Sequence, residues 1–309
     1  MREESAPGCV PSAASHEVGA APREAHAASD ELITQHRDGF SPGFTAITGE
    51  DDAGFGQGVD FGIHVLSLDE AFEEIGTKES AWVLMQGRAH VACAGREFAV
   101  ERSSLFDEAP TVLHVPPGTP LRIVARSERL EWAVTRASNT ATFTPRVFWP
   151  RDIEPEHRGL GLAHGTCVRN VRLVFDRTAR PQSNLVVGEV INYPGRWSSY
   201  PPHHHAQPEI YHYRFSAPQG YGHGEVGDRV YKVRAFDTLR IAAQHDHAQV
   251  AAPGYAMYYL WIVRHLENNA YAGFEYSPEH VWMLDPRAEI WQPDDVPYVR
   301  RRRGSGGEA

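Results

Sequence analysis

The chain has 309 residues, a formal net charge of −10 and a charged fraction of 23%, which is the composition of an ordinary globular protein. The acidic balance disfavours a nucleic-acid-binding surface, and no apolar run approaches the roughly 18 residues that a membrane-spanning helix needs. The length exceeds one ordinary domain, so we expect two.

The N-terminal region, residues 1–35, is rich in Ala, Ser, Pro and Glu. It offers too little apolar surface to offset the entropy lost on ordering, so we expect a disordered extension. At the other end, residues 291–309 carry Arg300–Arg303 beside a glycine-rich stretch. This composition is typical of a solvated tail.

Residues 36–145 alternate short apolar runs with turns, and we expect them to form a first β-barrel. Close turns, one of them at Gln86-Gly87, separate successive predicted strands. Hairpins this close together are typical of a sandwich or barrel. The clearest strands are Ala81–Met85, Ala89–Cys93 and Glu97–Val100.

Helices are expected to be few and short. The 22 prolines and 27 glycines, with few long amphipathic stretches, favour an all-β architecture. The one clear helix candidate is Leu68–Ile75, because the acidic residues at its start suit the N-terminal half of a helix.

The second half repeats the rhythm of the first. Residues 146–183, with three prolines and a glycine-rich segment, are predicted to be a connector, and residues 184–290 a second barrel. Two blocks of short strands with a matching turn rhythm predict two similar β-barrels in tandem. The predicted strands are Leu185–Ile191, Ser198–Pro202, Glu209–Phe215, Val230–Val233, Thr238–Ala242 and Ala256–Val263.

The number and spacing of the cysteines indicate the redox state of the compartment in which the protein works. Cys9, Cys93 and Cys167 are widely spaced and form no Cys-x-x-Cys pair. This spacing argues against a disulfide framework and fits a reducing compartment, so we expect a cytoplasmic protein.

The most informative stretch is Trp197–Tyr211, which contains His203, His205 and Glu209. Side chains two apart on a strand share a face, so His203 and His205 are predicted to point the same way. A short turn at 206–208 then brings Glu209 onto the next strand. Two imidazoles and a carboxylate that converge in this way suit a divalent transition metal.

The metal site needs a fourth ligand, and His247 is the best candidate. His245 shares a face with His247 if the segment is extended, so periodicity alone does not choose between them. His204 is predicted to point outward. The alternative is that this histidine cluster is plain surface, since the chain has 17 histidines. The first half carries no His-x-His, so we expect its barrel to lack metal ligands.

Tyrosines on the strand after the turn are candidates for catalysis. Glu209, Tyr211 and Tyr213 share one face, so both phenols can line the same cavity and donate a hydrogen bond or carry a proton. Plain core packing is the alternative for each. Arg196 is a candidate for neutralising a substrate carboxylate, and Tyr258 for substrate contact in an aromatic run that also suits packing.

These motifs resemble one known family. Residues 160–263 are similar to the 5-deoxy-glucuronate isomerases of inositol catabolism, which are related to 5-keto-4-deoxyuronate isomerase and built as two tandem cupin (jelly-roll) barrels. The similarity is fainter upstream, through Ser104–Pro110 and Val115–Pro120. The segments that carry it are Asn184–Val190, Gly195–His203, Pro208–Phe215, Pro218–Gly222 and Ala252–Leu260.

The resemblance implies a ligand set and a reaction. The ligands would be His203, His205, Glu209 and His247, the last because it stands before Tyr255 as the family's final histidine stands before its Gly-Tyr. The cofactor would be a divalent transition metal, Zn, Mn or Fe. The implied reaction interconverts 5-deoxy-glucuronate and 5-dehydro-2-deoxygluconate. The loop 206–208 is shorter than in the family.

Two other functions remain as alternatives. Three histidines and one glutamate also suit an Fe(II) dioxygenase on the same scaffold, and a non-catalytic sugar-acid-binding protein would use the barrel without turnover. In each case the expected partner is a small sugar acid, with no nucleic acid and no membrane. Homo-oligomerisation is left open.

Overall fold

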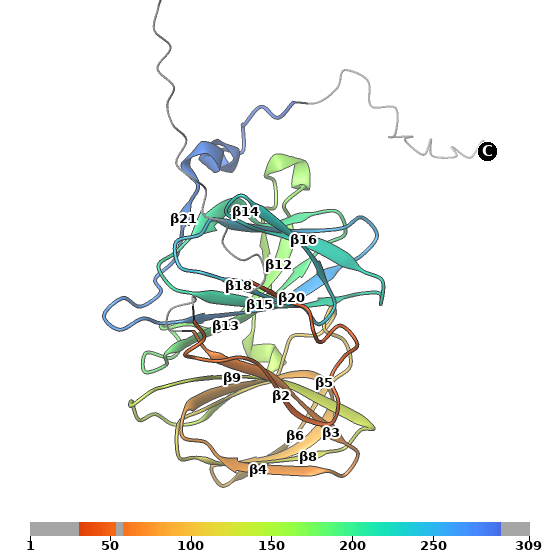
Figure 1. Ribbon diagram of the computed structural model, residues 1–309, viewed down its shortest axis with the longest axis vertical. Coiled ribbons are helices and arrows are strands. Elements are labelled where there is room, and N and C mark those ends of the chain that lie inside the picture. Colours follow the sequence, from red (N-terminus) through yellow and green to blue (C-terminus); the bar gives the residue numbers. More distant parts are fainter. Residues whose placement is uncertain (1–30, 54–57, 292–309) are drawn as a thin grey trace, which may run out of the picture. The chain divides into compact units, whose positions relative to one another are not determined.

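The computed structural model describes residues 31–53 and 58–291, which all lie in one compact unit, Glu31–Ala309. The predicted N-terminal extension lies outside the described residues except for its last five positions, and the predicted tail lies outside them except for Trp291. Two β-barrels account for nearly all of the chain described (Figure 1). In these parts no helix has the length and apolar character needed to cross a bilayer.

The N-terminal barrel is a nine-stranded antiparallel sheet in which β10-β7-β5-β9-β3-β2 form the main path and β4, β6 and β8 close the second face. Its interior is filled by large apolar side chains such as Trp82 and Trp132, both fully buried. The strands are β2 (Gly43–Thr48), β3 (Asp60–Ser67), β4 (Ala71–Ile75), β5 (Glu79–Cys93), β6 (Arg96–Arg102), β7 (Val112–Val115), β8 (Pro120–Ala125), β9 (Arg129–Ala137) and β10 (Arg146–Phe148).

The C-terminal barrel consists of two antiparallel sheets. One has the order β1-β18-β15-β20-β13-β12-β11 and the other β17-β16-β19-β14-β21. The strands are β1 (Leu32–Ile33), β11 (Glu156–Arg158), β12 (Arg169–Phe175), β13 (Leu185–Asn192), β14 (Trp197–His204), β15 (Glu209–Phe215), β16 (Tyr221–Val226), β17 (Arg229–Arg234), β18 (Thr238–Ile241), β19 (His247–Ala251), β20 (Met257–Arg264) and β21 (Glu275–Tyr276). Short 3-10 helices span Pro150–Asp152, Ala163–Gly165 and Pro278–Leu284.

The region predicted as a connector contains part of the second barrel. Strands β11 and β12 pair with each other, and β12 continues the ladder onto β13. Near the other end of the chain, β1 pairs with β18, so a segment before the first barrel also adds to the second. The C-terminal barrel is therefore assembled from segments on both sides of the N-terminal barrel.

The helix expected at Leu68–Ile75 is wrong. A turn with Asp69 at a positive φ of 61° is followed by β4, which pairs with β8. The acidic residues that suited a helix N-terminus instead form ion pairs, Glu73 with Arg122 and Glu74 with Arg136. Pairing with a strand distant in the sequence outweighs the local preference, and this pairing packs Phe72 against the barrel core.

The hairpin turn predicted at Gln86-Gly87 is also wrong, because β5 runs through it as one strand of 15 residues. The register against β9 shifts between Leu84 and Gln86, and Gly87 has a φ of 98°. Before this point β5 pairs with β7 and β9, and after it with β6 and β8. The glycine allows the strand to bend from one face of the barrel to the other.

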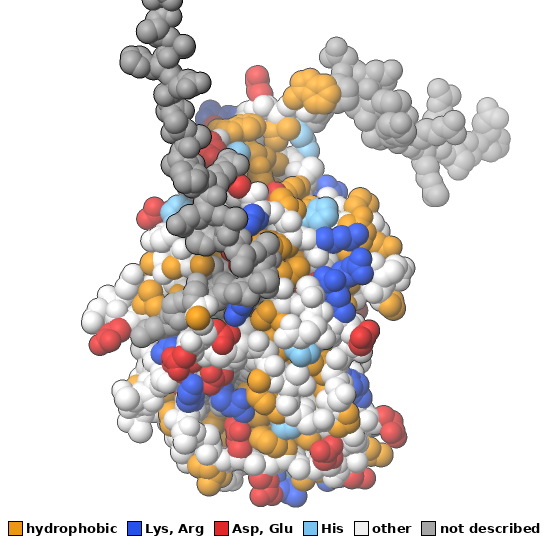
Figure 2. Space-filling model, viewed as in Figure 1, with side chains coloured by type: hydrophobic (Ala, Val, Ile, Leu, Met, Phe, Trp, Pro, Cys, Tyr) orange, Lys and Arg blue, Asp and Glu red, His pale blue; other side chains and the backbone are white. Residues whose placement is uncertain are grey.

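A shared core joins the two barrels. It contains apolar residues of both, including Ile63 and Met85 from the first and Ile210, Tyr258 and Ile262 from the second. A separate core inside the second barrel holds Tyr211, Tyr213, Phe215 and Tyr259. On the face drawn in Figure 2, acidic and basic side chains lie interspersed.

Candidate metal centre

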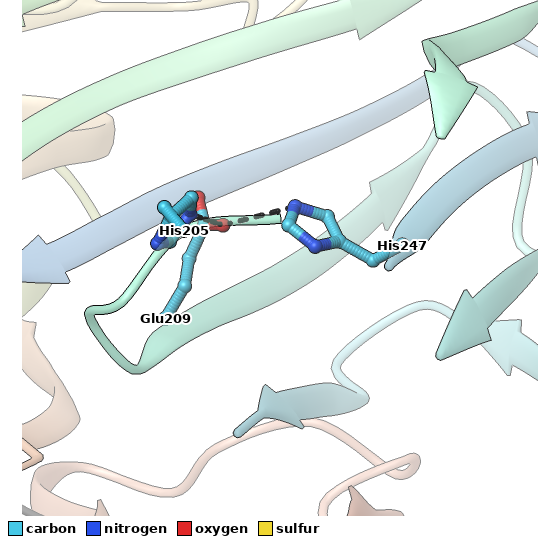
Figure 3. Close-up of side chains that lie close together, drawn as sticks. All are labelled: His205, Glu209 and His247. Carbon is cyan, nitrogen blue, oxygen red and sulfur yellow. Dashed lines mark hydrogen bonds and ion pairs between the residues drawn. The ribbon is translucent and has the colours of Figure 1, made fainter. Parts of the chain in front are cut away.

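Three side chains converge inside the C-terminal barrel. Ligand atoms of His205, Glu209 and His247 all lie within 4.8 Å of one another. Oε2 of Glu209 is 3.2 Å from Nε2 of His205 and 3.3 Å from Nε2 of His247. Figure 3 shows His205 beside Glu209, with His247 reaching the same carboxylate from another strand.

The local chain path brings these groups together. A short turn leads into β15 at Glu209, as the sequence predicted, but β14 ends at His204, so His205 lies just past the strand and not on it. The His205 carbonyl accepts a hydrogen bond from the Gln244 amide at 2.9 Å, and the Gln207 side chain donates to the Asn269 carbonyl at 2.7 Å. These bonds hold the turn against segments far along the chain.

His203 lies next to this group but outside the set of three. Its ring centroid is 4.3 Å from that of His247 and 4.3 Å from that of Phe274. Its Nδ1 is buried and has no hydrogen-bond partner among the described residues. His204 turns the other way, with Nδ1 2.7 Å from Oδ1 of Asp246. The role of His203 as a ligand remains a prediction.

His247, and not His245, joins the other ligand candidates. His247 is the first residue of β19 and is 1% exposed, whereas His245 is exposed in the preceding turn. The alternation of side chains along a strand did not distinguish His245 from His247, because that argument assumes an extended segment. The chain at Ala242–Asp246 is not extended, and Gln244 has a positive φ of 65°.

The protonation states in the site suit metal binding. Burial on its own would raise the pKa of Glu209, but hydrogen bonds to His205 and His247 outweigh it and lower that pKa to about 2. Burial, and next the neighbouring His247, lower the pKa of His203 well below its usual value. At neutral pH the site therefore offers an ionised carboxylate and a neutral imidazole, the forms in which these groups bind metals. A buried set of nitrogen and oxygen donors fits a divalent transition metal.

A small cavity of about 50 Å³ adjoins these residues. His203, His205 and Glu209 form one part of its wall, and Tyr271 and Phe274, from the segment after β20, form another.

The two predicted catalytic tyrosines differ in their surroundings. Tyr211 lines the cavity, and its ring centroid is 5.8 Å from that of His247. Burial, and next the Glu209 charge, raise the pKa of the Tyr211 phenol well above its usual value, so it stays protonated at neutral pH. The Tyr213 hydroxyl instead donates to Oε1 of Gln249 at 2.6 Å. Tyr213 is not among the residues that line the cavity.

The two predicted substrate-binding residues are not brought into the cavity. Successive side chains on β20 point to opposite faces, so Tyr258 enters the core between the barrels, where its hydroxyl donates to Glu189 at 2.9 Å. Its neighbour Tyr259 lines the cavity. Arg196 is not among the lining residues, whereas Arg158 and Arg169 are. Both arginines lie on strands that were predicted as connector, so sequence reasoning missed them.

Comparison with known proteins supports the resemblance inferred from the motifs. Residues 32–283 match the model of the KduI/IolB family. A protein of Geobacillus kaustophilus named 5-deoxy-glucuronate isomerase is 28% identical over 260 residues, which cover 76% of this chain and 89% of that protein. A protein of the same name from Geobacillus thermodenitrificans is 27% identical over 280 residues, which cover 83% of this chain and 96% of that protein.

Solved structures confirm the predicted fold class, two tandem cupin barrels. An IolB-like protein from Salmonella typhimurium LT2 matches with a TM-score of 0.73 and 24% identity, over 83% of this chain and 100% of that chain. An oxalate decarboxylase from Lactobacillus farciminis matches with a TM-score of 0.60 and 14% identity, over 81% of this chain and 89% of that chain. At these identities the likeness is one of fold.

Proposed function

We propose, because this chain belongs to the KduI/IolB family, that it is a metal-dependent isomerase that interconverts 5-deoxy-glucuronate and 5-dehydro-2-deoxygluconate. Its relatives named 5-deoxy-glucuronate isomerase support the reaction. The observation that carries the proposal is the convergence of His205, Glu209 and His247 inside the C-terminal barrel, beside a cavity that His205 and Glu209 line.

His203, His205, Glu209 and His247 would hold the metal, a divalent Zn, Mn or Fe. Glu209 supports this assignment, because two histidines converge on its carboxylate, whereas the buried Glu131 and Glu189 pair with arginine and the buried Glu79 pairs with one histidine, His114. A buried carboxylate needs a compensating positive charge. The bound cation would act as a Lewis acid that polarises the substrate carbonyl.

Side chains of the protein would donate and accept the proton during the reaction. The isomerisation moves a hydrogen from the hydroxyl-bearing carbon 2 to the aldehyde carbon 1, and the hydroxyl proton of carbon 2 to the oxygen of carbon 1. We assign to Tyr211 the donation of a hydrogen bond or proton to an oxygen of the substrate, because its phenol is protonated and lines the cavity. Tyr213 is a weaker candidate, because its hydroxyl is held by Gln249.

Tyr271 and Phe274 line the cavity beside the candidate ligands. With substrate bound, these aromatic rings would exclude bulk water from the reacting carbons.

The experiment combines metal analysis with an NMR assay on 5-deoxy-glucuronate. We expect purified protein to contain about one transition metal ion per chain and to form the ketose product without consuming oxygen. The Glu209→Gln and His205→Ala variants should lose bound metal and turnover. The His245→Ala variant should keep bound metal and turnover, because His245 is an exposed neighbour of the site. Unchanged metal content and turnover in the first two variants would show the proposal to be wrong, and oxygen consumption would favour the dioxygenase alternative.

A further inference from the structure

Arg169 differs from the other buried arginines of the described chain in its lack of an acidic partner. Arg169 is 8% exposed, and no carboxylate among the described residues lies at ion-pair distance from it. Its guanidinium donates to the Cys167 carbonyl at 3.2 Å. The other four pair with carboxylates: Arg102 and Arg172 with Glu189, Arg214 with Glu131, and Arg264 with Glu50.

Arg169 also lies at the cavity. It is the first residue of β12, directly opposite Arg158 on β11, and both arginines line the space that His203, His205 and Glu209 border. Arg158 is more exposed and pairs with Glu156 at 2.8 Å. Within the described residues, no protein carboxylate neutralises the Arg169 guanidinium, which is therefore an uncompensated positive charge in the cavity wall.

This arrangement has a cost for the protein alone. Like charges directly opposite each other on neighbouring strands destabilise a sheet. Burial lowers the pKa of the Arg169 guanidinium, which reflects the penalty for holding its charge away from water. An anion bound in the cavity would offset both penalties.

We propose that Arg169, with Arg158 beside it, binds the carboxylate of the sugar-acid substrate and so makes the enzyme specific for acids over neutral sugars. The inference rests on the proposed function. A planar guanidinium can bind both oxygens of a carboxylate through two parallel hydrogen bonds. The carboxylate is carbon 6 of the substrate, at the far end from the reacting carbons, so the two ends would be held by different groups.

The first test measures binding without turnover. The probes are D-glucuronate and D-glucose, which differ in the carboxylate, and the readout is the affinity obtained from ligand-dependent thermal shifts of the metal-loaded protein. We expect wild type to bind glucuronate at least about 10-fold more tightly than glucose, and Arg169→Gln to lose that preference. The control is Arg229→Gln, since Arg229 lies in the same barrel but pairs with Glu31 and does not line the cavity.

The second test measures turnover. Arg169→Gln should lower kcat/KM for 5-deoxy-glucuronate about 100-fold with metal content unchanged, and by less than about 3-fold for 5-deoxy-glucose, which lacks the carboxylate. Equal losses for both sugars would overturn the proposal. If Arg169→Gln does not fold, Arg169→Lys decides: loss of the paired hydrogen bonds should weaken glucuronate binding at least about 5-fold, and unchanged affinity would overturn the proposal.

The two proposals fail in different ways. Wild-type protein that binds glucuronate through Arg169 but does not convert 5-deoxy-glucuronate would refute the isomerase function and leave the carboxylate site standing. Active wild-type protein that binds glucuronate and glucose equally, or whose Arg169→Gln variant binds glucuronate as wild type does, would refute the carboxylate site alone.

Discussion

His203 and His247 lie directly opposite each other on the paired strands β14 and β19, with ring centroids 4.3 Å apart. The two residues are distant in the sequence, so the register of this strand pair sets the geometry of the candidate metal centre. A slip by one residue would bring Asp246 or Ala248 opposite His203 and turn the His247 ring to the other face.

The adjacent histidines His203 and His204 give a matched pair of variants. His203→Ala should lower metal affinity at least about 10-fold and abolish most turnover, because it removes a buried imidazole from the centre. His204→Ala loses a half-buried contact with Asp246 and should change stability by less than about 1 kcal/mol, with metal content intact. Metal titration followed by activity measurement checks both. Equal metal affinity in the two variants would exclude His203 as a ligand.

Variants of the two β15 tyrosines should distinguish a catalytic role from a packing role. Tyr211→Phe should lower kcat about 100-fold or more with metal content unchanged, because it removes the phenol that lines the cavity. Tyr213→Phe breaks the hydrogen bond to Gln249 and should lower the free energy of unfolding by about 1 kcal/mol, with kcat nearly unchanged. Steady-state kinetics and denaturant unfolding of both variants provide the measurements. A Tyr211→Phe enzyme with wild-type kcat would rule out the assigned role.

Glu189 is expected to hold the two barrels together. It pairs with Arg102 of the first barrel and Arg172 of the second, and both its carboxylate and the Arg102 side chain are fully buried. Glu189→Gln leaves two buried guanidinium groups without a carboxylate and should lower the free energy of unfolding by about 3–5 kcal/mol. Glu73→Gln, which breaks the exposed pair with Arg122, should cost less than about 1 kcal/mol. Urea unfolding checks both values, and similar losses would contradict the assignment.

Stability should decline as the pH falls below the ordinary histidine range, in part through His212. Burial, and next the charges of Arg214 and His36, lower the pKa of His212 well below 6.5. The native state therefore stays neutral at this position while the unfolded chain takes up a proton, so the contribution is complete above pH 6.5 and is lost as the pH falls below it. The slope per histidine is at most about 1.4 kcal/mol per pH unit.

The His212→Gln variant tests that contribution. Its free energy of unfolding should fall less steeply between pH 6.5 and 5.5 than that of wild type, since one buried neutral histidine has been removed. Urea unfolding at several pH values gives the two slopes. Identical slopes would mean that His212 titrates alike in the native and unfolded states.

Local alternation along the chain was enough to predict the strand that carries Glu209. Tyr211, Tyr213 and Phe215 enter the interior of the second barrel, whereas Ile210 faces the core between the barrels. The same rule separates Tyr258 from Tyr259, but the sequence contains no signal for which face of β20 meets the cavity. That depends on how β20 pairs with β13 and β15.

The predictions of secondary structure were wrong where pairing with distant segments outweighs the local preference of the sequence. The acidic start of Leu68–Ile75 suited a helix, yet pairing with β8 makes most of that segment a strand. The connector was judged by its prolines and glycines, yet β12 completes a ladder with β13. Arg169 was missed for this reason, since an arginine in a presumed linker carries no sign that a cavity lies beside it.

Sequence was sufficient to bring His203, His205 and Glu209 to one cavity, because a strand, a short turn and the next strand place them near one another by local geometry. Periodicity did not choose between His247 and His245, but the family resemblance favoured His247, which the tertiary structure brings to Glu209. Only the tertiary structure left Arg169 without a carboxylate beside the same cavity and directed Tyr258 away from it. These outcomes depend on strand register and on burial against distant segments. Such interactions gain their free energy from contacts that no local window of the chain contains.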